Sequence, residues 1–598
     1  MSQIRAPYAR AMADLTNAQI AAAFDELGDL YELDGAVAYR VIAYRTAAKT
    51  VRETTVSVVQ MARDGRVTEL NGVGKILEEK ILALDETGDI PTAKKLRDKF
   101  PSGLLSVMHL PGFGPKRARR LYDELGVDSL DALRAAAEEQ KIRELRGFGA
   151  KVEEQLLKTL AESPEGGPAP RILLSRAENI AEQIVGALRS HPSAEQVEVA
   201  GSLRRQADSV KDLDIIATAK DPAALAAALG ELSLVESVLH AAGDAGARVM
   251  THAGIKVDLK VVEPDQFGNV LQHFTGSKAH NVALRESAVR RGLHVSEYGI
   301  LDDATGETVR CATEEEVYET LGLAWIPPEL REGRGELEAA LPGGPGLPAL
   351  ITADDMRGDL HCHTTLSDGR QTLEQMVSAA QGRGLEYLAV TDHSASHGFG
   401  DHVTPEALAE RIEEIRALNA SLEDFEVLAG TEVNILPDGT LDYDDELLAK
   451  LDWVIASVHT SFSMSEQEMT DRMIRAIEHP WVDAIGHPTG RKIETRQPYA
   501  LDVERVIEAA ARTGTMLEIN SAPDRRDLNE LHARAAAKAG VGVLINTDAH
   551  SAKNFALLRY GIATARRAWL TPEQVPNTRP WAEFAPLRKR ARKSTAAG

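Results

Sequence analysis

The sequence has little cysteine and no long apolar run. Its 598 residues include two cysteines, Cys311 and Cys362, too few for a disulfide framework or a cysteine-rich zinc site. This scarcity fits a reducing compartment. No apolar stretch of about 18 residues occurs, which argues against a membrane span. The first residues, MSQIRAPYARAMADLTNAQ, also lack the apolar core of a signal peptide. We therefore expect a cytoplasmic protein.

Basic charge is also in deficit. The chain has 68 lysines and arginines against 91 aspartates and glutamates, a net charge of −23. Taken alone, this balance argues against a nucleic-acid partner, because phosphate binding usually leaves a basic footprint. Two effects weaken the objection: acidic clusters can hold divalent cations, and backbone N–H groups can bind phosphate without any side-chain charge. Any binding to DNA is therefore expected to be weak and sensitive to salt.

The chain divides into stretches of different pattern. At roughly 150 residues per domain, its length predicts about four domains. Residues 1–165 read as short helices, and Thr16-x-x-Gln19 has the form of a helix capping box. Linkers are indicated by the segments 165–170 and 341–348, which are rich in glycine and proline. Between the linkers, a helix at 172–188 precedes runs that predict strands at 197–200, 213–217 and 255–262.

After the second linker, short apolar strands alternate with helices. Seven β/α units in a row predict a barrel of parallel strands. The predicted strands lie near 360 and at 387–390, 427–429, 453–458, 484–485, 516–519 and 541–545. The end of the chain, with Arg588, Lys589, Arg590, Arg592 and Lys593, reads as a basic disordered terminus that is either solvated or in contact with DNA.

One glycine pattern recurs three times between helical segments, at 70–75, 110–116 and 145–151. Glycines allow a tight turn and the close approach of a foreign backbone. The N–H groups that open the following helix can then hold a phosphate. A single copy would be an ordinary turn, but three copies resemble the helix-hairpin-helix motif of DNA repair proteins, which contacts the DNA backbone without reading bases. The predicted DNA-binding residues are Gly72, Gly74, Lys75, Gly112, Gly114, Lys116, Gly147 and Gly149.

Three aspartates follow a glycine–serine pair, Gly201-Ser202. In a strand, residues two apart face the same way, so Asp212 and Asp214 present two carboxylates on one face. A third, Asp258, lies in an alternating strand that would bring it close if the two strands pair. Such a cluster is unfavourable without cations, and two Mg²⁺ ions would support in-line displacement at phosphorus. The spacing therefore predicts a catalytic metal site for nucleotidyl transfer.

Residues 1–330 resemble the family X DNA polymerases. Gly201-Ser202 and the three aspartates match the palm motif of that family in order and spacing, as does the run His-Phe-Thr-Gly-Ser-Lys-Ala-His-Asn at 273–281. The resemblance implies a palm that adds deoxynucleotides to a primer 3′ end with Mg or Mn, and we expect Asp258 to activate the primer hydroxyl. The nucleotide-binding residues that it implies are Gly201, Ser202, Arg205, His273, Phe274, Gly276, Lys278, Asn281 and Arg285, the last of them near the template strand.

Several positions depart from or complicate this resemblance. His273-Phe274 stands where many eukaryotic relatives carry Tyr-Phe, which leaves sugar discrimination open. Lys278 near the expected base suggests nucleotide binding before template pairing. Lys80 falls at the Schiff-base lysine of the family's lyase domain, but Ile76 stands where relatives often have a phosphate-binding lysine. A deoxyribose-phosphate lyase and an ordinary solvated lysine therefore both stay open.

The last third of the chain places histidines and carboxylates behind apolar strands. Active sites of parallel barrels gather at those strand ends, so nine such donors are hard to explain as packing. Nitrogen and carboxylate donors suit Zn²⁺, Mn²⁺ or Fe, and clustered ions would activate water and neutralise a phosphate ester. His361 and His363 share one strand face, so Cys362 is expected in the core, and Glu432 could bridge two ions. The candidate ligands are His361, His363, Asp368, His393, Glu432, His459, His487, Asp548 and His550.

This stretch resembles the polymerase-and-histidinol-phosphatase (PHP) domain over about 355–570. All nine ligands of that family map onto the residues above, which argues against a degenerate copy. The domain order matches bacterial family X polymerases, in which the PHP domain is linked to 3′→5′ exonuclease activity and in some to abasic-site endonuclease or 3′-phosphatase activity. The resemblance implies about two or three divalent ions here, Mn, Zn or Fe.

The resemblances imply a multidomain α and α/β protein that acts on gapped or primer-template DNA. We expect a nucleoid-associated monomer that works in base excision or strand-break repair. The expected segments are a lyase-like helical domain at 1–90, a fingers-type helix-hairpin-helix domain at 91–165, a nucleotidyltransferase palm at 171–262, a thumb at 263–335, a linker at 336–354, a distorted (β/α)7 PHP barrel at 355–572 and a basic tail at 573–598.

Three hypotheses follow from the sequence. The first is a gap-filling polymerase with a metal-dependent nuclease that processes 3′ ends. The second is a phosphatase or nuclease in which only the PHP domain is catalytic and the N-terminal half merely binds. The third is a scaffold for DNA ends without enzymatic activity. The hairpins speak against the second, and two complete metal constellations speak against the third.

Overall fold

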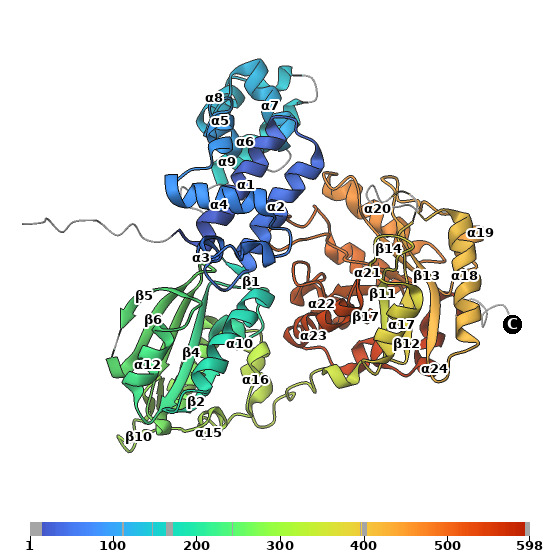
Figure 1. Ribbon diagram of the computed structural model, residues 1–598. Helices are drawn as coiled ribbons and strands as arrows, with labels where there is room; N and C mark the ends of the chain where they lie inside the picture. The colour runs from blue at the N-terminus through green and yellow to red at the C-terminus, as the bar shows by residue number, and fades with distance from the viewer. Residues whose placement is uncertain are drawn as a thin grey trace, which may run out of the picture. The chain divides into compact units, whose positions relative to one another are not determined.

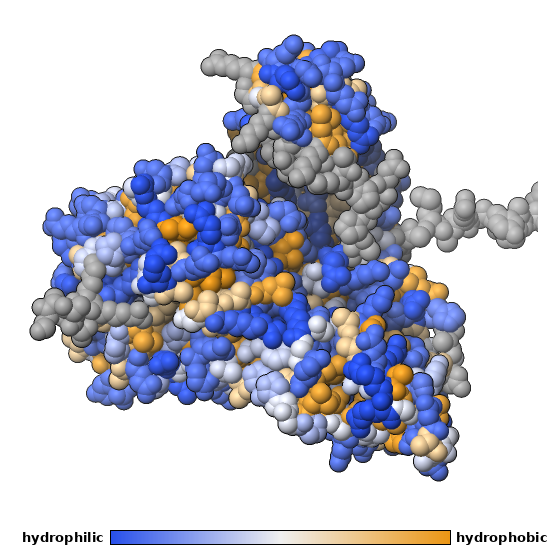
Figure 2. Space-filling model, turned by 180° about the vertical axis from the view of Figure 1, so that it is seen from behind, coloured by the Kyte–Doolittle hydropathy of each residue, from blue (hydrophilic) through white to orange (hydrophobic). Residues whose placement is uncertain are grey.

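The computed structural model describes residues 15–110, 113–145, 148–162, 171–241, 243–394, 396 and 403–591. The chain forms two compact units. The first comprises Met1–Arg171, Ile180–Glu198 and Lys211–Val262, and the second Ile172–Asn179, Val199–Val210 and Glu263–Gly598. No described helix is both long and apolar enough to cross a membrane. Figure 2 shows hydrophilic residues over much of the surface, with apolar residues in scattered patches.

The N-terminal part of the first unit is helical, as the sequence predicts (Figure 1). The predicted capping box is present, because Thr16 caps α1 and Gln19 returns a bond to the Thr16 N–H. One hydrophobic cluster extends from Ile20 to Leu160, so the two helical domains predicted at 1–90 and 91–165 share a core. The elements are α1 (Asn17–Leu33), α2 (Ala38–Glu53), α3 (Val58–Arg63), η1 (Val67–Glu69), α4 (Lys75–Thr87), α5 (Pro91–Arg97), α6 (Ser102–Met108), α7 (Gly114–Leu125), α8 (Leu130–Glu138), η2 (Ile142–Glu144) and α9 (Ala150–Glu162).

A mixed five-stranded sheet completes the first unit. Its strand order is β2-β4-β7-β6-β5, with β4 parallel to β7 and β6 antiparallel to both β7 and β5. The sequence predicts β2, β4 and β7 but not the partly exposed hairpin of β5 and β6. Helix α12 packs on this sheet. The elements are β2 (Ala194–Val199), β4 (Asp212–Ala219), α12 (Pro222–Gly230), β5 (Val235–Ala241), η3 (Gly243–Ala245), β6 (Gly246–Thr251) and β7 (Lys256–Val261).

The helix predicted at 172–188 starts two residues later than expected. Ile172 and Leu173 form β1, which pairs with β3 (Ser209–Val210), and α10 runs over Leu174–Arg189. Pairing with a strand distant in sequence has no local signal, which explains the difference. Helix α11 (Gly201–Arg204) lies in the segment of the second unit that ends at Val210.

The next region of the second unit is a small α/β body with its own core. A three-stranded antiparallel sheet has the order β10-β9-β8. The carboxylate of Glu314 is buried between Arg331 and Arg204, with N–O distances of 2.6–3.0 Å. The elements are η4 (Pro264–Gln266), α13 (Phe267–Thr275), α14 (Lys278–Val289), β8 (Leu293–Ser296), β9 (Gly299–Asp302), β10 (Thr308–Val309), α15 (Glu314–Thr320), η5 (Pro328–Leu330) and α16 (Glu336–Ala340).

Seven parallel strands in sequence order form the barrel, which confirms the predicted architecture. A parallel bridge between Cys362 and Ala549 brings the two ends of the sheet together. Figure 1 shows helices around these strands. The strands are β11 (Gly358–Cys362), β12 (Tyr387–Val390), β13 (Glu426–Asn434), β14 (Trp453–Ser457), β15 (Ala484–Ile485), β16 (Met516–Asn520) and β17 (Val543–Asn546). The helices are η6 (Ala353–Asp355), α17 (Leu373–Gln381), α18 (Pro405–Asn419), α19 (Asp445–Leu448), α20 (Glu466–Glu478), α21 (Val503–Thr513), α22 (Glu530–Lys538), η7 (Ala552–Leu557) and α23 (Leu558–Arg567).

The expected disordered tail is wrong for residues 573–591. Beyond η8 (Pro572–Gln574) and η9 (Pro576–Thr578), α24 (Trp581–Phe584) and η10 (Ala585–Leu587) continue the fold. Phe584 is fully buried against the barrel core. The Lys589 ammonium donates to two barrel carbonyl oxygens, and Arg590 pairs with a buried aspartate. Lysine and arginine side chains can be buried when their charged groups find partners inside the protein. A prediction from charge alone does not detect this. Arg592 and Lys593, like the predicted linker 165–170, lie outside the described residues.

Candidate active sites

The three predicted palm carboxylates lie on neighbouring strands. Asp212 and Asp214 point to one face of β4, and β7 pairs beside it in parallel with Asp214 opposite Asp258. The pairing on which the sequence prediction depended is therefore present, and all three side chains are partly exposed at one place on the sheet. Their roles stay a prediction.

An arginine that the sequence did not predict completes this cluster. Arg248 lies opposite Asp258 in the antiparallel pair of β6 and β7, with 2.5 Å between its Nε and Oδ1 of Asp258. The hydrogen bond and charge of Asp258, with smaller contributions from Asp212 and Asp214, raise the pKa of Arg248. The three carboxylates therefore favour a positive charge beside them. Their donors are all oxygen atoms, which suit Mg²⁺ or Mn²⁺. Because β6 has no clear strand pattern, no sequence signal marks Arg248.

The Arg205 side chain makes its contacts within the second unit. Its Nη1 donates to the carbonyl oxygen of Thr275 at 2.6 Å, and its Nε lies 3.1 Å from Oε1 of Glu332. Gly201 opens α11 with a φ of +63°, a conformation that disfavours larger residues. Ser202 follows it in the same helical turn.

Most predicted nucleotide-pocket residues gather between α13 and α14. The Arg285 guanidinium lies 3.1 Å from Nδ1 of His273, whose ring contacts that of Phe274 at 5.1 Å between centroids. Asn281 donates to the His273 carbonyl oxygen at 2.7 Å. Lys278 begins α14, with an exposed side chain. Gly276, which precedes the α14 cap at Ser277, has a φ of +66°.

The hairpin glycines precede helices, as expected. Gly72 has a φ of +81°, Gly74 caps α4, and Lys75 opens that helix with an exposed side chain. Gly114 opens α7 with a φ of +46°, the Lys116 side chain is exposed, and Gly149 immediately precedes α9. The apolar residues between the glycines, Val73, Phe113 and Phe148, are buried. Gly112 and Gly147 lie outside the described residues.

Lys80 lies on α4, partly buried. Its Nζ donates to the Thr92 hydroxyl at 3.2 Å. Burial lowers the pKa of Lys80, against the opposing charge of Glu79. A lowered pKa increases the fraction of neutral amine, the form that attacks carbonyl carbon. Ile76, one turn before, is exposed.

The nine predicted metal ligands come together at the carboxyl ends of the barrel strands. His361 and Glu432 belong to β11 and β13, and most of the others follow a strand within a few residues. Most of these residues form three groups, and within each group the ligand atoms all lie within 4.8 Å of one another. The groups are His363, Asp368, His393 and His550; His361, His363 and Asp548; and His393, Glu432 and His459.

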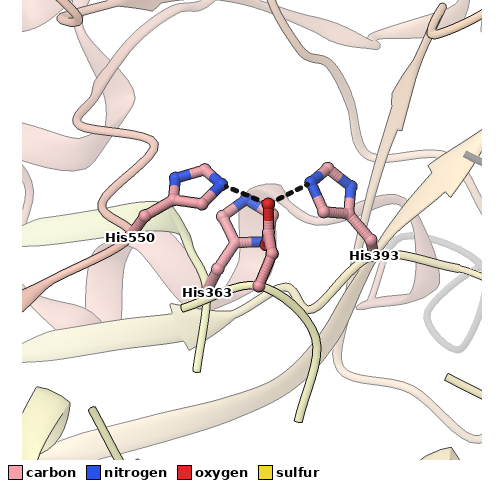
Figure 3. A group of neighbouring side chains, drawn as sticks. His363, His393 and His550 are labelled. Atoms are coloured by element: carbon pink, nitrogen blue, oxygen red, sulfur yellow. Dashed lines mark ion pairs between the residues drawn. The ribbon is translucent and has the colours of Figure 1, made fainter. Parts of the chain in front are cut away.

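Asp368 and Glu432 are the carboxylate centres of this cluster. Oδ2 of Asp368 lies 3.1 Å from Nε2 of His550 and 3.7 Å from Nε2 of His393, and Figure 3 shows His363, His393 and His550 converging. Glu432 has both carboxylate oxygens among imidazoles. Those nearest to it, at 2.8–3.6 Å, are His361, His363, His393, His459 and His487.

The low pKa of Glu432 and its lack of ordinary hydrogen bonds among the described residues indicate a site for a cation. Burial raises its pKa, but the surrounding histidines outweigh burial and hold it well below the usual range. Nε2 of His361 and both oxygens of Glu432 are buried without a hydrogen bond of ordinary geometry among the described residues. Unsatisfied buried polar atoms are costly and call for a ligand. The nitrogen and oxygen donors suit divalent metal ions, and a glutamate with histidines at each oxygen suits a bridge between two of them.

A buried glutamate that the sequence did not predict orients two of these histidines. Glu518 in β16 accepts from Nδ1 of His361 at 2.8 Å and from the backbone N–H of His487 at 2.7 Å. Metal-binding histidines usually donate their other ring nitrogen to such an acceptor. The only sequence signal is an acidic residue inside an apolar strand. Cys362 is fully buried and its thiol donates to a carbonyl oxygen at 3.4 Å, which agrees with the predicted core position.

A cavity of ≈ 480 Å³ opens over the ligands and has a cationic wall. Nε of Arg525 lies 3.9 Å from Oδ2 of Asp548, and Lys492 pairs with Asp524 at 3.2 Å. The Arg496 guanidinium lies 4.3 Å from the centre of the Phe462 ring. Cations and an aromatic face beside a metal cluster suit a phosphate ester of a nucleoside.

Four family models match the chain. They describe a helix-hairpin-helix domain at residues 15–90, a SAM-like helix-hairpin-helix tandem at 104–162, a DNA polymerase beta thumb at 270–332 and a PHP domain at 359–522. These matches fall on the helical region, the small α/β body after the five-stranded sheet, and the barrel.

A relative covers nearly the whole chain. It is the DNA polymerase/3′-5′ exonuclease PolX of Bacillus subtilis (strain 168), 39% identical over 92% of this chain and 95% of its own length. The chain belongs to the family X DNA polymerases that carry a PHP domain. The predicted resemblance is thereby confirmed, as are the helix-hairpin-helix, thumb-type and PHP-barrel folds.

Other relatives of this family X chain match only part of it. A probable phosphatase of Thermoanaerobacter sp. (strain X514) is 32% identical over 37% of this chain and 89% of its own length. A second, from Caldanaerobacter subterraneus subsp. tengcongensis, is 35% identical over 32% of this chain and 75% of its own length. These partial matches leave most of the family X chain unaccounted for, so the PHP-only hypothesis is the weaker one.

Proposed function

We propose that this protein is a DNA polymerase that adds deoxynucleotides to a primer 3′ end in gapped DNA and hydrolyses 3′ ends at its PHP barrel. One observation carries the proposal: a single chain contains both the three carboxylates on β4 and β7 and nine metal-type donors at the barrel strand ends. The near full-length relation to a protein named as polymerase and 3′-5′ exonuclease supports it.

At the palm, each aspartate has a proposed role. Asp212, Asp214 and Asp258 hold Mg or Mn, which when bound would neutralise the triphosphate and support in-line displacement. Asp258 accepts the proton of the primer 3′-hydroxyl, because it is the third carboxylate of the cluster and comes from a separate strand. Arg248 pairs with Asp258 and competes with the metal ion for its carboxylate.

Nucleotide selection is proposed for the residues around α13 and α14. Arg205 and the Gly201–Ser202 turn bind the triphosphate. His273 and Phe274 line the sugar side, and the hydrogen bond from Asn281 supports the His273 backbone. The other proposed pocket residues are Gly276, Lys278 and Arg285.

At the barrel, we propose that the nine donors hold two or three divalent ions, Mn, Zn or Fe, which when bound neutralise the phosphate and activate water. Arg525 and Lys492 then bind the phosphate next to the terminal bond. The terminal base stacks on the Arg496 guanidinium, which itself lies on the Phe462 ring. Opening the terminal base pair would expose that base, so frayed or mismatched 3′ ends are the proposed substrates.

DNA is held by the hairpin segments. The exposed Lys75 and Lys116 lie at the starts of helices that follow glycine turns, and the first N–H groups of such helices can bind backbone phosphate. We propose a monomer that works at the nucleoid in the cytoplasm, in base excision or strand-break repair. The proposed domains are those of the sequence prediction, except that 573–591 belongs with the barrel.

A second activity, a deoxyribose-phosphate lyase, is favoured by one observation. Lys80 has a lowered pKa and donates to a hydroxyl, with no acidic partner at its Nζ among the described residues. Borohydride trapping of the protein on a 5′-deoxyribose-phosphate end would give a covalent adduct that Lys80→Ala abolishes. An equal yield from the variant would assign the adduct to another amine.

The decisive experiment follows a 5′-labelled primer on a gapped duplex with Mg²⁺ or Mn²⁺, with and without the four deoxynucleotides. Longer products with nucleotides and shorter products without them would support both activities. Shortening alone would reduce the N-terminal half to a DNA-positioning module. No change in length would contradict the proposal and favour a small-molecule phosphatase, which p-nitrophenyl phosphate would reveal.

A further inference from the structure

The barrel contacts the segment that carries the proposed triphosphate-binding residues. Residues 199–210, which include Gly201, Ser202 and Arg205, belong to the same compact unit as the barrel. Three arginines of the barrel reach the end of this segment. These barrel arginines are Arg491 after β15, Arg526 after β16 and Arg567 at the end of α23.

Arg567 contacts Arg205 itself. Its Nη1 donates to the backbone carbonyl oxygen of Arg205 at 2.8 Å, and to Oε1 of Glu332 at the same distance. Its Nη2 donates to Glu530 at 3.0 Å. The side chain is 6% exposed, so these bonds are shielded from water. Buried charged hydrogen bonds of this kind define position strongly, because an unpaired partner is costly.

The other two barrel arginines hold the next residues. Arg526 is fully buried, donates to the carbonyl oxygen of Gln206 at 3.0 Å and lies 3.3 Å from Oδ1 of Asp208. Arg491 lies 2.9 Å from Oδ2 of the same aspartate. Gln206 has a φ of +57°, a backbone conformation that residues other than glycine rarely adopt. The surrounding contacts therefore maintain a conformation that the segment would not favour alone.

Glu332 links the barrel to the Arg205 guanidinium. Its Oε1 lies 3.1 Å from Nε of Arg205 and 2.8 Å from Nη1 of Arg567. The carboxylate therefore has two cations rather than one. If Arg567 were lost, Glu332 would pair with Arg205 alone and neutralise more of the charge that a triphosphate needs.

We propose that Arg567, supported by Arg526 and Arg491, is a positioning residue for nucleotide binding, so that the end-processing domain sets the geometry of the polymerase's triphosphate arginine. This inference rests on the proposed function, since the triphosphate role of Arg205 is itself proposed. It makes the PHP barrel part of the polymerase and not only a neighbouring nuclease.

The test compares two adjacent arginines of α23. Arg567→Met removes the contacts above. Arg566→Met is the matched control, because Arg566 pairs with Glu329 at 2.7 Å and donates to a carbonyl oxygen at 3.1 Å. Among the described residues it makes no hydrogen bond or ion pair with 199–210. KM and kcat for a deoxynucleotide are measured in primer extension, with 3′-end hydrolysis and Tm alongside.

We expect Arg567→Met to raise KM for the nucleotide about tenfold, with a smaller change in kcat, because ground-state binding is weakened. Arg566→Met should keep KM within about twofold, since most substitutions away from such features are small. Arg567→Lys, which keeps a charge near Glu332, should recover part of the affinity. Both methionine variants should retain 3′-end hydrolysis.

Equal KM values for the two methionine variants would overturn the inference, and so would a loss of kcat alone. If the wild-type protein adds no nucleotide, the proposed function fails while the inference stays testable. In that case a fluorescent deoxynucleoside triphosphate with Mg²⁺ serves as the probe. Arg567→Met must weaken its binding about tenfold relative to Arg566→Met, and equal binding would contradict the positioning role.

Discussion

The palm carboxylates and the barrel ligands handle negative charge in opposite ways. Asp212, Asp214 and Asp258 are partly exposed, and the chain supplies one exposed arginine, Arg248, beside them. In the barrel, Glu432 is 1% exposed among histidines whose own partners, such as Glu518, are buried too. The palm is therefore open to exchange of cations with solvent, whereas the barrel has a fixed set of donors around an enclosed centre.

This difference indicates how each site acquires its metal. An open cluster of carboxylates binds Mg²⁺ weakly and is completed by the phosphates of the substrate. Enclosed imidazole and carboxylate donors bind transition metals without help from substrate. We infer that the palm takes up its cations together with the nucleotide, while the barrel keeps resident ions.

The largest expected effect separates the two sites completely. Asp258→Ala should lower nucleotide addition by at least about a thousandfold and leave 3′-end hydrolysis intact, because it removes the proposed proton acceptor. His361→Ala should do the reverse. Both activities are measured on the same labelled primer. If either variant, folded and bound to DNA, lost both activities, the two-site comparison would be wrong.

An effect of intermediate size is expected at Glu314, a buried carboxylate that pairs with two arginines. Burial raises the pKa of Glu314, but Arg331 and Arg204 outweigh burial and hold it at about 2. Glu314→Gln should lower the free energy of unfolding at pH 7 by about 3–5 kcal/mol, because it leaves Arg331 buried and unpaired. The stability from the depressed pKa is present above pH 4.5 and is lost as the pH falls towards 2, so the difference from wild type should shrink over that window.

Urea unfolding followed by tryptophan fluorescence at several pH values would check this expectation. Trp325 donates to the Glu314 carboxylate at 3.4 Å and provides a local signal. Glu338→Gln, at an exposed position on α16, is the control and should change stability by less than about 0.5 kcal/mol. A difference for Glu314→Gln that stays constant from pH 7 to the acid limit would contradict the assigned pKa.

A smaller effect is expected at the buried partner of the barrel histidines. Glu518→Gln weakens the acceptor of His361 Nδ1, and loss of such partners typically costs about 10–100-fold in metal affinity or activity. We expect that decrease in bound metal, read by elemental analysis after dialysis, and in 3′-end hydrolysis. Nucleotide addition should not change. Glu504→Gln, exposed on α21, is the control. Full metal content in Glu518→Gln would show that the ligands orient themselves.

The smallest effect is expected at Arg248 and concerns the magnesium requirement of the palm. Arg248→Gln removes a cation that competes with metal for Asp258. The Mg²⁺ concentration for half-maximal nucleotide addition should therefore fall by about threefold, as expected for loss of an exposed competing charge. Magnesium titrations of wild type and variant measure it, with 3′-end hydrolysis as the internal control. A higher magnesium requirement would mean that Arg248 orients Asp258 more than it competes.

Local patterns in the sequence determined the element types and the positions of the chemistry. Alternation of apolar residues placed β4 and β7, and seven β/α units predicted the barrel, because periodicity reports which face of an element is buried. Short spacings such as Asp212-x-Asp214 and His361-x-His363 indicated shared faces for the same reason. The family could be predicted because its motifs are short and continuous.

Only the tertiary structure decided which distant residues support those motifs. Arg248 meets Asp258 from β6, a strand without a clear sequence pattern, and Glu518 meets His361 across 157 positions of sequence. Arg567 reaches Arg205 across 362 positions. The basic end of the chain looked solvated, yet Lys589 is buried because barrel carbonyl oxygens satisfy its charge. Such partners are selected by packing and by the cost of an unpaired buried charge, neither of which leaves a local signal in the sequence.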